Sequence, residues 1–122
     1  MNTTRRFGLA AAFVALAGVA SVLAAPDLPE RVVTHWNAAG EPDGTMPRTL
    51  ALVFLPALSA ALLGLFAVLP RLDPLGENVA AFRATYDWFV VLLAGFLLIV
   101  HAGVLAFILG YEFDFVLLVL AG

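Results

Sequence analysis

Three long apolar blocks dominate the chain and are separated by short polar segments. Residues 7–25, 50–69 and 89–109 hold no Asp, Glu, Lys or Arg, and His101 is the single ionisable side chain within them. A helix needs about 20 residues to cross a bilayer core, and soluble helices of that length carry a polar face. The pattern predicts an all-α, polytopic transmembrane protein with three full spans. A fourth apolar block, residues 115–122, is too short to cross, and predicts a partial span at the end of an N-terminal fragment.

The first apolar block also has features of a secretory signal peptide. Arg5 and Arg6 precede it, and residues 22–24 (Val-Leu-Ala) resemble a cleavage site. Its nineteen apolar residues exceed a usual signal core of about 7–15 residues. We therefore expect this block to remain as a membrane anchor, with cleavage as the alternative.

The arginines predict the orientation of the spans. Cytoplasmic loops are enriched in basic residues, and four of the six arginines lie before the first span or between the second and third. Segment 26–48 carries the other two. We therefore expect a multi-pass protein of the cell membrane, with the N-terminus in the cytoplasm and segment 26–48 outside it.

Small residues predict that the spans pack together. Small side chains four positions apart allow helix backbones to approach closely. The first span has Gly8, Ala11, Ala15 and Gly18 on one stripe, the second has Ala60 and Gly64, and the third has Ala102, Ala106 and Gly110. Since small pairs also arise by chance in a chain this rich in alanine, the stripes indicate only that the spans pack together.

Composition narrows the function classes. Hydrophobic residues make up 63% of the chain and charged residues 12%, without any cysteine or lysine. The basic stripe of a nucleic-acid-binding protein is missing from the sequence. No nucleophile with a neighbouring base and no glycine-rich phosphate loop can be found either. We therefore predict a protein of the lipid bilayer that is not an enzyme, takes no cofactor and binds no nucleic acid.

The polar segment 26–48 is rich in structural signals. Asp27 and Glu30 form a candidate capping box that would open a short helical turn. Residues 32–36 suit an extended segment, while residues 37–40 and 42–44 have turn composition. The segment therefore predicts a compact, ordered loop against the membrane surface.

The same segment carries a recognisable signature. Residues 28–32 (Leu-Pro-Glu-Arg-Val), 34–37 (Thr-His-Trp-Asn) and 40–44 (Gly-Glu-Pro-Asp-Gly) resemble domain of unknown function 1648, as do residues 70–74 (Pro-Arg-Leu-Asp-Pro). That domain forms the front of SdpI-like immunity membrane proteins. The resemblance implies a polytopic membrane protein linked to resistance against a secreted toxic peptide, and to signalling by capture of a repressor at the membrane. Val33 stands where the family often has proline, and residues 45–48 replace a glycine-rich stretch that ends in lysine.

Two sets of candidate site residues follow. Histidine and two carboxylates in one loop are plausible ligands for a hard metal ion, but their spacing matches no established pattern, so we predict no metal site. A partner-binding surface is the favoured interpretation of the loop, although its tryptophan also suits an interfacial anchor. Its candidates are His35, Trp36, Asn37, Glu41, Asp43 and Gly44. Within the membrane, His101 and Ser59 lie at similar depths and are the candidate polar pair.

Three functions remain open at this stage. The first is an SdpI-like immunity or signalling protein whose outer loop binds a toxic peptide or a membrane protein partner. The second is part of a transporter, with His101 on a proton path, because ionisable residues within spans are costly and indicate function by default. The third is a structural subunit that only packs against other membrane proteins.

Overall fold

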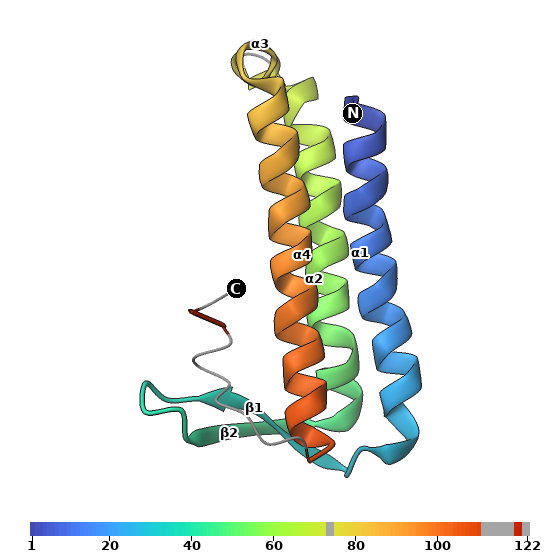
Figure 1. Ribbon diagram of the computed structural model, residues 1–122, viewed down its shortest axis with the longest axis vertical. Helices are drawn as coiled ribbons and strands as arrows, with labels where there is room; N and C mark the ends of the chain where they lie inside the picture. Colours follow the sequence, from blue (N-terminus) through green and yellow to red (C-terminus); the bar gives the residue numbers. More distant parts are fainter. Residues whose placement is uncertain (73–74, 111–118, 121–122) are drawn as a thin grey trace.

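The computed structural model describes residues 1–72, 75–110 and 119–120. Three long helices run side by side (Figure 1): α1 (Thr3–Ala24), α2 (Arg48–Val68) and α4 (Arg83–Ile108). With their terminal helical turns, they give apolar segments of 25, 24 and 26 residues, each long enough to cross a membrane. The three predicted spans are therefore confirmed as membrane-length helices.

Short elements connect the long helices. The 3₁₀ turn η1 (Ala25–Asp27) ends the first span, and η2 (Leu69–Arg71) with the short helix α3 (Leu75–Ala81) joins α2 to α4. The N-terminus of the chain and α3 lie at one end of the bundle, which we call the α3 end (Figure 1). The opposite end, which carries two strands, is the hairpin end.

The third span begins earlier than the apolar block predicted. Helix α4 starts at Arg83 and runs through Asp87 without a break, whereas the sequence placed the start at residue 89. The predicted boundary excluded the charged residues before position 89. In the structure, Arg83 pairs with Asp87 one helical turn later, at 2.9 Å between Nε and Oδ1. A charge that is matched on the same helix does not end the helix.

The segment between α1 and α2 is an antiparallel β-hairpin (Figure 1). Strand β1 (Arg31–Trp36) pairs with β2 (Pro42–Pro47), and the pairing is irregular around His35. The predicted extended segment is confirmed, but residues 42–44 are strand rather than turn. The predicted capping box is also wrong, because Asp27 ends a 3₁₀ turn that precedes Glu30.

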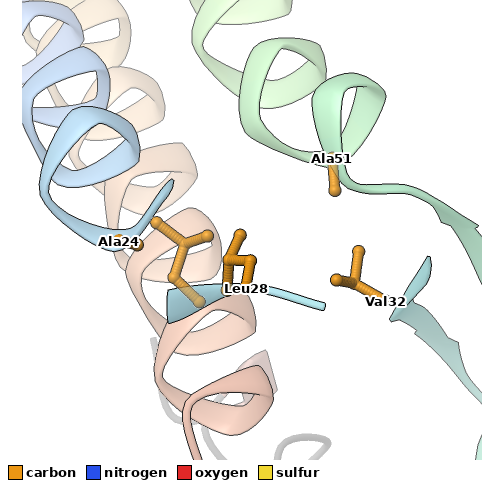
Figure 2. Packing of buried hydrophobic residues seen from close by; sticks show 5 residues of the cluster. Ala24, Leu28, Val32 and Ala51 are labelled. Carbon is orange, nitrogen blue, oxygen red and sulfur yellow. The ribbon is translucent and has the colours of Figure 1, made fainter. Parts of the chain in front are cut away.

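The hairpin packs against the helices through its apolar side chains. Figure 2 shows Leu28 between Ala24, at the end of α1, and Val32, which lies below Ala51 near the start of α2; together with Leu105 they form one buried cluster. Arg48 closes the base of the hairpin, because its backbone N–H donates to the Glu30 carbonyl and its side chain donates to the Leu28 carbonyl, both at 2.8 Å. The hairpin is therefore held as part of the bundle.

The spans pack together as predicted, but the stripes of small residues are not the packed faces. On α1 the buried positions are Ala10, Ala17, Ser21 and Ala24. A Cβ added at Gly8, Gly18 or Gly64 would meet nothing within 4 Å. Alanine and glycine are so frequent in this chain that their spacing does not identify the packed face.

The predicted partial span at 115–122 lies outside the described residues, apart from Val119 and Leu120. Val119 packs against the cluster of Trp36 and Val104, at the hairpin end.

Candidate functional site

Asn37 builds the turn between the two strands. Its side-chain Oδ1 accepts hydrogen bonds from the backbone N–H groups of Ala39 at 3.0 Å and Glu41 at 3.1 Å. Its own N–H donates to the Glu41 carbonyl at 2.9 Å, and its carbonyl accepts from Gly40. Gly40 has a φ of 82°, a left-handed conformation that favours glycine. The predicted turn at residues 37–40 is confirmed, and Asn37 acts as the residue that shapes it.

His35 and Asp43 face each other across the hairpin and form an exposed pair. The His35 Nδ1 contacts the Asp43 carboxylate, and their side chains are 72% and 41% exposed. Gly44 makes this close approach possible, because a Cβ at that position would lie 2.9 Å from the His35 Cβ. The strand therefore requires glycine here for space, which explains why turn-like composition occurs in a strand.

The other two candidates of the hairpin, Trp36 and Glu41, differ in burial. Trp36 is buried, and its ring packs edge-on against Phe107 of α4, with 5.1 Å between centroids. Glu41 is exposed at the turn. Of the six residues predicted to contact a partner, the structure therefore leaves His35, Glu41 and Asp43 as the exposed polar side chains, while Trp36 anchors the hairpin on the bundle.

The hairpin and its supporting helices coincide with a known family signature. Residues 12–60 match the family model described as Domain of unknown function (DUF1648). The DUF1648 match runs from the middle of α1, through the hairpin, to the middle of α2. No curated protein and no solved structure shows significant similarity to the chain.

Within the DUF1648 match, Ser21 joins three helices through polar contacts. Its hydroxyl lies 2.6 Å from the Leu52 carbonyl of α2 and 2.7 Å from Nε2 of His101 on α4. The Leu52 carbonyl has no amide partner four residues later, because Pro56 stands there. His101 is 1% exposed. The Ser21 hydroxyl thus replaces the helix hydrogen bond that proline removes, and the His101 ring contacts this hydroxyl.

The predicted pairing of His101 with Ser59 is wrong. The hydroxyl that contacts the His101 ring belongs to Ser21 of α1. Ser59 is buried elsewhere, where it lines a small cavity between α2 and α4 with Leu62 and Leu97. Depth along a helix says nothing of its rotation, and rotation decides which side chains meet.

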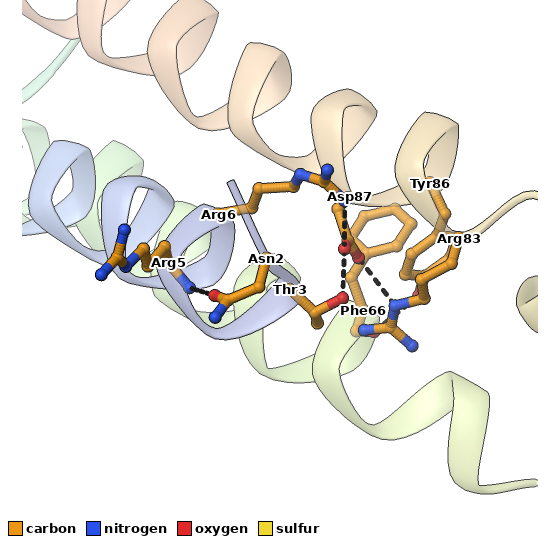
Figure 3. Close-up of polar contacts among 8 residues, drawn as sticks. All are labelled: Asn2, Thr3, Arg5, Arg6, Phe66, Arg83, Tyr86 and Asp87. Atoms are coloured by element: carbon orange, nitrogen blue, oxygen red, sulfur yellow. Dashed lines mark hydrogen bonds and ion pairs between the residues drawn. The ribbon is translucent and has the colours of Figure 1, made fainter.

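A charged cluster at the α3 end was missed by the sequence reasoning. Asp87 is 0% exposed and pairs with Arg83 and with Arg6 of α1, at 3.2 Å from the Arg6 Nη1 (Figure 3). The Thr3 hydroxyl donates to the same carboxylate at 2.6 Å. Arg6 also lies over the Trp88 ring, 5.7 Å from its centroid. The spacing of Arg83 and Asp87, four residues apart, was the available signal.

This cluster fastens α1 to α4. A buried carboxylate is tolerated when it is paired and hydrogen-bonded, and here one carboxylate receives two guanidinium groups and a hydroxyl. Tyr86 adds a link to α2, since its hydroxyl donates to the Phe66 carbonyl (Figure 3 shows both residues). The α3 end is therefore a fixed end of the bundle.

Within the described part of the chain, no group of three or more His, Cys, Asp or Glu residues is placed to hold a metal ion. Among the described residues, the exposed polar surface of the hairpin is the feature that offers charged groups to a partner.

Proposed function

We propose that this protein acts as an SdpI-like immunity or signalling protein whose hairpin captures a cationic peptide at the outer face of the cell membrane. The observation that carries the proposal is an acidic, exposed hairpin held firmly on a transmembrane bundle. The DUF1648 match, which covers this hairpin, supports the choice of site.

The charges of the hairpin segment favour a cationic partner. Segment 26–48 holds four carboxylates and two arginines. The carboxylates, Asp27, Glu30, Glu41 and Asp43, are exposed. The Arg48 side chain is engaged with the Leu28 carbonyl, and the exposed Arg31 side chain donates to the Thr45 hydroxyl, so the carboxylates outnumber the arginines by two. A surface of one sign attracts and orients a partner of the opposite sign, so a basic peptide is the chemistry that fits.

The position of the hairpin suits interception at the membrane. Basic amphipathic peptides lie in the membrane interface, with their apolar face among the lipids. The hairpin sits at the end of membrane-length helices (Figure 1), where such a peptide would be held. The four arginines at the α3 end favour placing the hairpin end on the outside.

Recognition through side chains fits this hairpin better than addition of a third strand. The pairing of β1 is interrupted on both sides of His35, and Pro42 and Pro47 in β2 carry no N–H group. Bulges and prolines hinder pairing with another strand. The exposed side chains, among them the carboxylates, remain for contact.

A binding measurement tests the proposal. The protein is placed in nanodiscs of zwitterionic lipid and titrated with a basic amphipathic peptide, with a glutamine-substituted neutral peptide as comparison. We expect the double variant Glu30→Gln/Glu41→Gln to bind the basic peptide about three- to tenfold more weakly at low salt, since each exposed charge contributes up to about 1 kcal/mol. Added salt should reduce binding by the unaltered chain.

Glu77→Gln is the matched control, because Glu77 is an exposed carboxylate at the α3 end. That variant should bind as the parent does. Equal binding of the basic and the neutral peptide, or equal loss in the control, would contradict the proposal. In sensitive cells that produce the protein, the double variant should protect less against a toxic basic peptide, at equal abundance in the membrane.

A further inference from the structure

His35 and Asp43 meet because the pairing of the hairpin is irregular at this point. The strands pair His35 with Gly44 and Trp36 with Pro42, so Asp43 is an extra residue in β2. In a regular strand, Asp43 would point to the face opposite that of Gly44, whereas a bulge redirects such a side chain. The Asp43 carboxylate contacts the His35 Nδ1, and the two side chains are 41% and 72% exposed. The irregularity therefore places a titratable ring against a carboxylate at the surface of the hairpin.

Asp43 is the charged group that faces His35. Strand β1 packs against β2, α2 and α4, and the ion pair with Asp43 is the polar side-chain contact that His35 makes among the described residues. The other charged or titratable groups on or beside these elements are held by other partners, lie at the α3 end, or are exposed to solvent. In that order they are Arg31, Arg48 and His101; Arg83 and Asp87; and Asp27, Glu30 and Glu41.

Protonation of His35 changes the charge that the hairpin presents to a peptide. Histidine ordinarily gains its proton as the pH falls from 8 to about 5.5, a range in which carboxylates stay charged. At the upper pH, the four carboxylates of segment 26–48 exceed its two arginines by two charges. At the lower pH, a new positive charge on His35 lies directly against the Asp43 carboxylate. The attraction for a basic peptide must therefore weaken as the pH falls.

We infer that the pair of His35 and Asp43 makes capture of a basic peptide dependent on pH, so that the hairpin holds the peptide near pH 8 and releases part of it near pH 5.5. The inference rests on the peptide capture proposed above and adds a regulation of that site. Acidification on the hairpin side of the membrane lowers the affinity, because the protonated ring offsets the Asp43 carboxylate.

A peptide of constant charge tests the inference. The protein is placed in nanodiscs of zwitterionic lipid and titrated at low salt with an amphipathic peptide that has arginine as its only ionisable side chain and has blocked ends. Arginine keeps its charge throughout this pH range, so a change in affinity with pH reports on the protein. We expect the unaltered chain to bind this peptide about two- to fivefold more weakly at pH 5.5 than at pH 8, as the loss of one exposed charge implies.

Two variants identify the responsible histidine. The chain has two histidines, and the measurement is the ratio of the affinities at the two pH values within each variant, so a change in absolute affinity does not affect it. His35→Gln should bind with nearly equal affinity at both pH values, whereas His101→Gln, the matched control, should keep the ratio of the parent.

The possible failures are distinguishable. Binding by the parent that is equal at both pH values overturns the inference and leaves peptide capture intact. A pH dependence that persists in His35→Gln, or that disappears in His101→Gln, also overturns it. Absence of binding at either pH contradicts the proposed function, and the inference falls with it.

Discussion

At the scale of single residues, the buried polar groups act as links between helices. His101 was expected from the sequence to pair with a hydroxyl of a neighbouring helix, and it contacts Ser21 of α1. Its partner could not be predicted, because two serines lie at suitable depths and the sequence does not encode the rotation of each helix. The burial of Asp87 was not predicted, because this residue precedes Trp88 in a stretch that resembles the edge of a span. Its burial follows from Arg6, a residue 81 positions away.

The charged cluster predicts a large effect of neutralising Asp87. In Asp87→Asn, two guanidinium groups lose their counter-charge, and breaking a buried pair typically costs about 3–5 kcal/mol. Arg83 is a third exposed and can reach solvent, so we expect a loss of about 1–3 kcal/mol in the free energy of unfolding. Unfolding in graded SDS–detergent mixtures measures this loss. Glu77→Gln, which removes an exposed carboxylate, should change it by less than about 0.5 kcal/mol.

Two substitutions of His101 separate a packing role from a proton-relay role. His101→Gln keeps a donor for Ser21 and should unfold with nearly the parent free energy, while His101→Leu should lose about 0.5–1.5 kcal/mol. A relay needs the titratable nitrogen, so proton flux into liposomes should be the same for the parent and the Gln variant. Flux that is present in the parent and absent from a normally folded Gln variant would favour a transporter.

At the scale of elements, the helices were easier to predict than the hairpin. Apolar length alone identifies a span, because the bilayer sets the number of residues that a helix needs. The hairpin depends on contacts between residues on opposite strands, and the composition of each segment alone does not reveal these contacts. Asp43 and Gly44 have turn composition, yet Gly44 lies in a strand because the His35 side chain occupies the space that a Cβ would need. The turn at Asn37 was predicted correctly, since it forms from neighbouring residues only.

The close contact at Gly44 predicts a local loss of hairpin structure on substitution. In Gly44→Ala the new Cβ would meet the His35 Cβ at 2.9 Å, so a strand must shift. We expect the amides of β1 and β2 to exchange hydrogen about five- to thirtyfold faster, the equivalent of about 1–2 kcal/mol. Gly64→Ala is the control, because nothing lies within 4 Å of its added Cβ. Unchanged protection of the hairpin in Gly44→Ala would contradict the packing described for His35.

At the scale of the whole molecule, the bundle joins a fixed α3 end to a hairpin end that offers an exposed surface. The number of spans was predictable, but the faces that pack were not, because small residues occur all round each helix. Helix α1 supplies Arg6 and Ser21 to the two polar clusters. Cleavage of α1 as a signal peptide would therefore leave Asp87 and His101 without these partners, and retention of α1 stays our prediction.

The orientation of the bundle can be tested directly, because the chain has no cysteine. Single cysteines at Ala39, in the hairpin turn, and at Asn78, on α3, lie at opposite ends and at exposed positions. With the N-terminus in the cytoplasm, an impermeant maleimide added to intact cells should label Ala39→Cys, and should label Asn78→Cys only after the cells are opened. The reverse pattern would show that the hairpin faces the cytoplasm.

The two prolines of the second span have a consequence for how the protein is made. Pro56 and Pro70 each leave a carbonyl without its amide, and hydroxyls of Ser21 and Tyr86 reach the Leu52 and Phe66 carbonyls. Tyr86 is translated after α2. When α2 leaves the ribosome, its Phe66 carbonyl therefore still lacks the hydroxyl that later donates to it. An exposed carbonyl is unfavourable in hydrocarbon, and α2 should therefore stay in the aqueous channel of the insertion machinery until α4 follows. Nascent chains halted before residue 86 should then crosslink to that machinery rather than to lipid, and longer chains should be released from it.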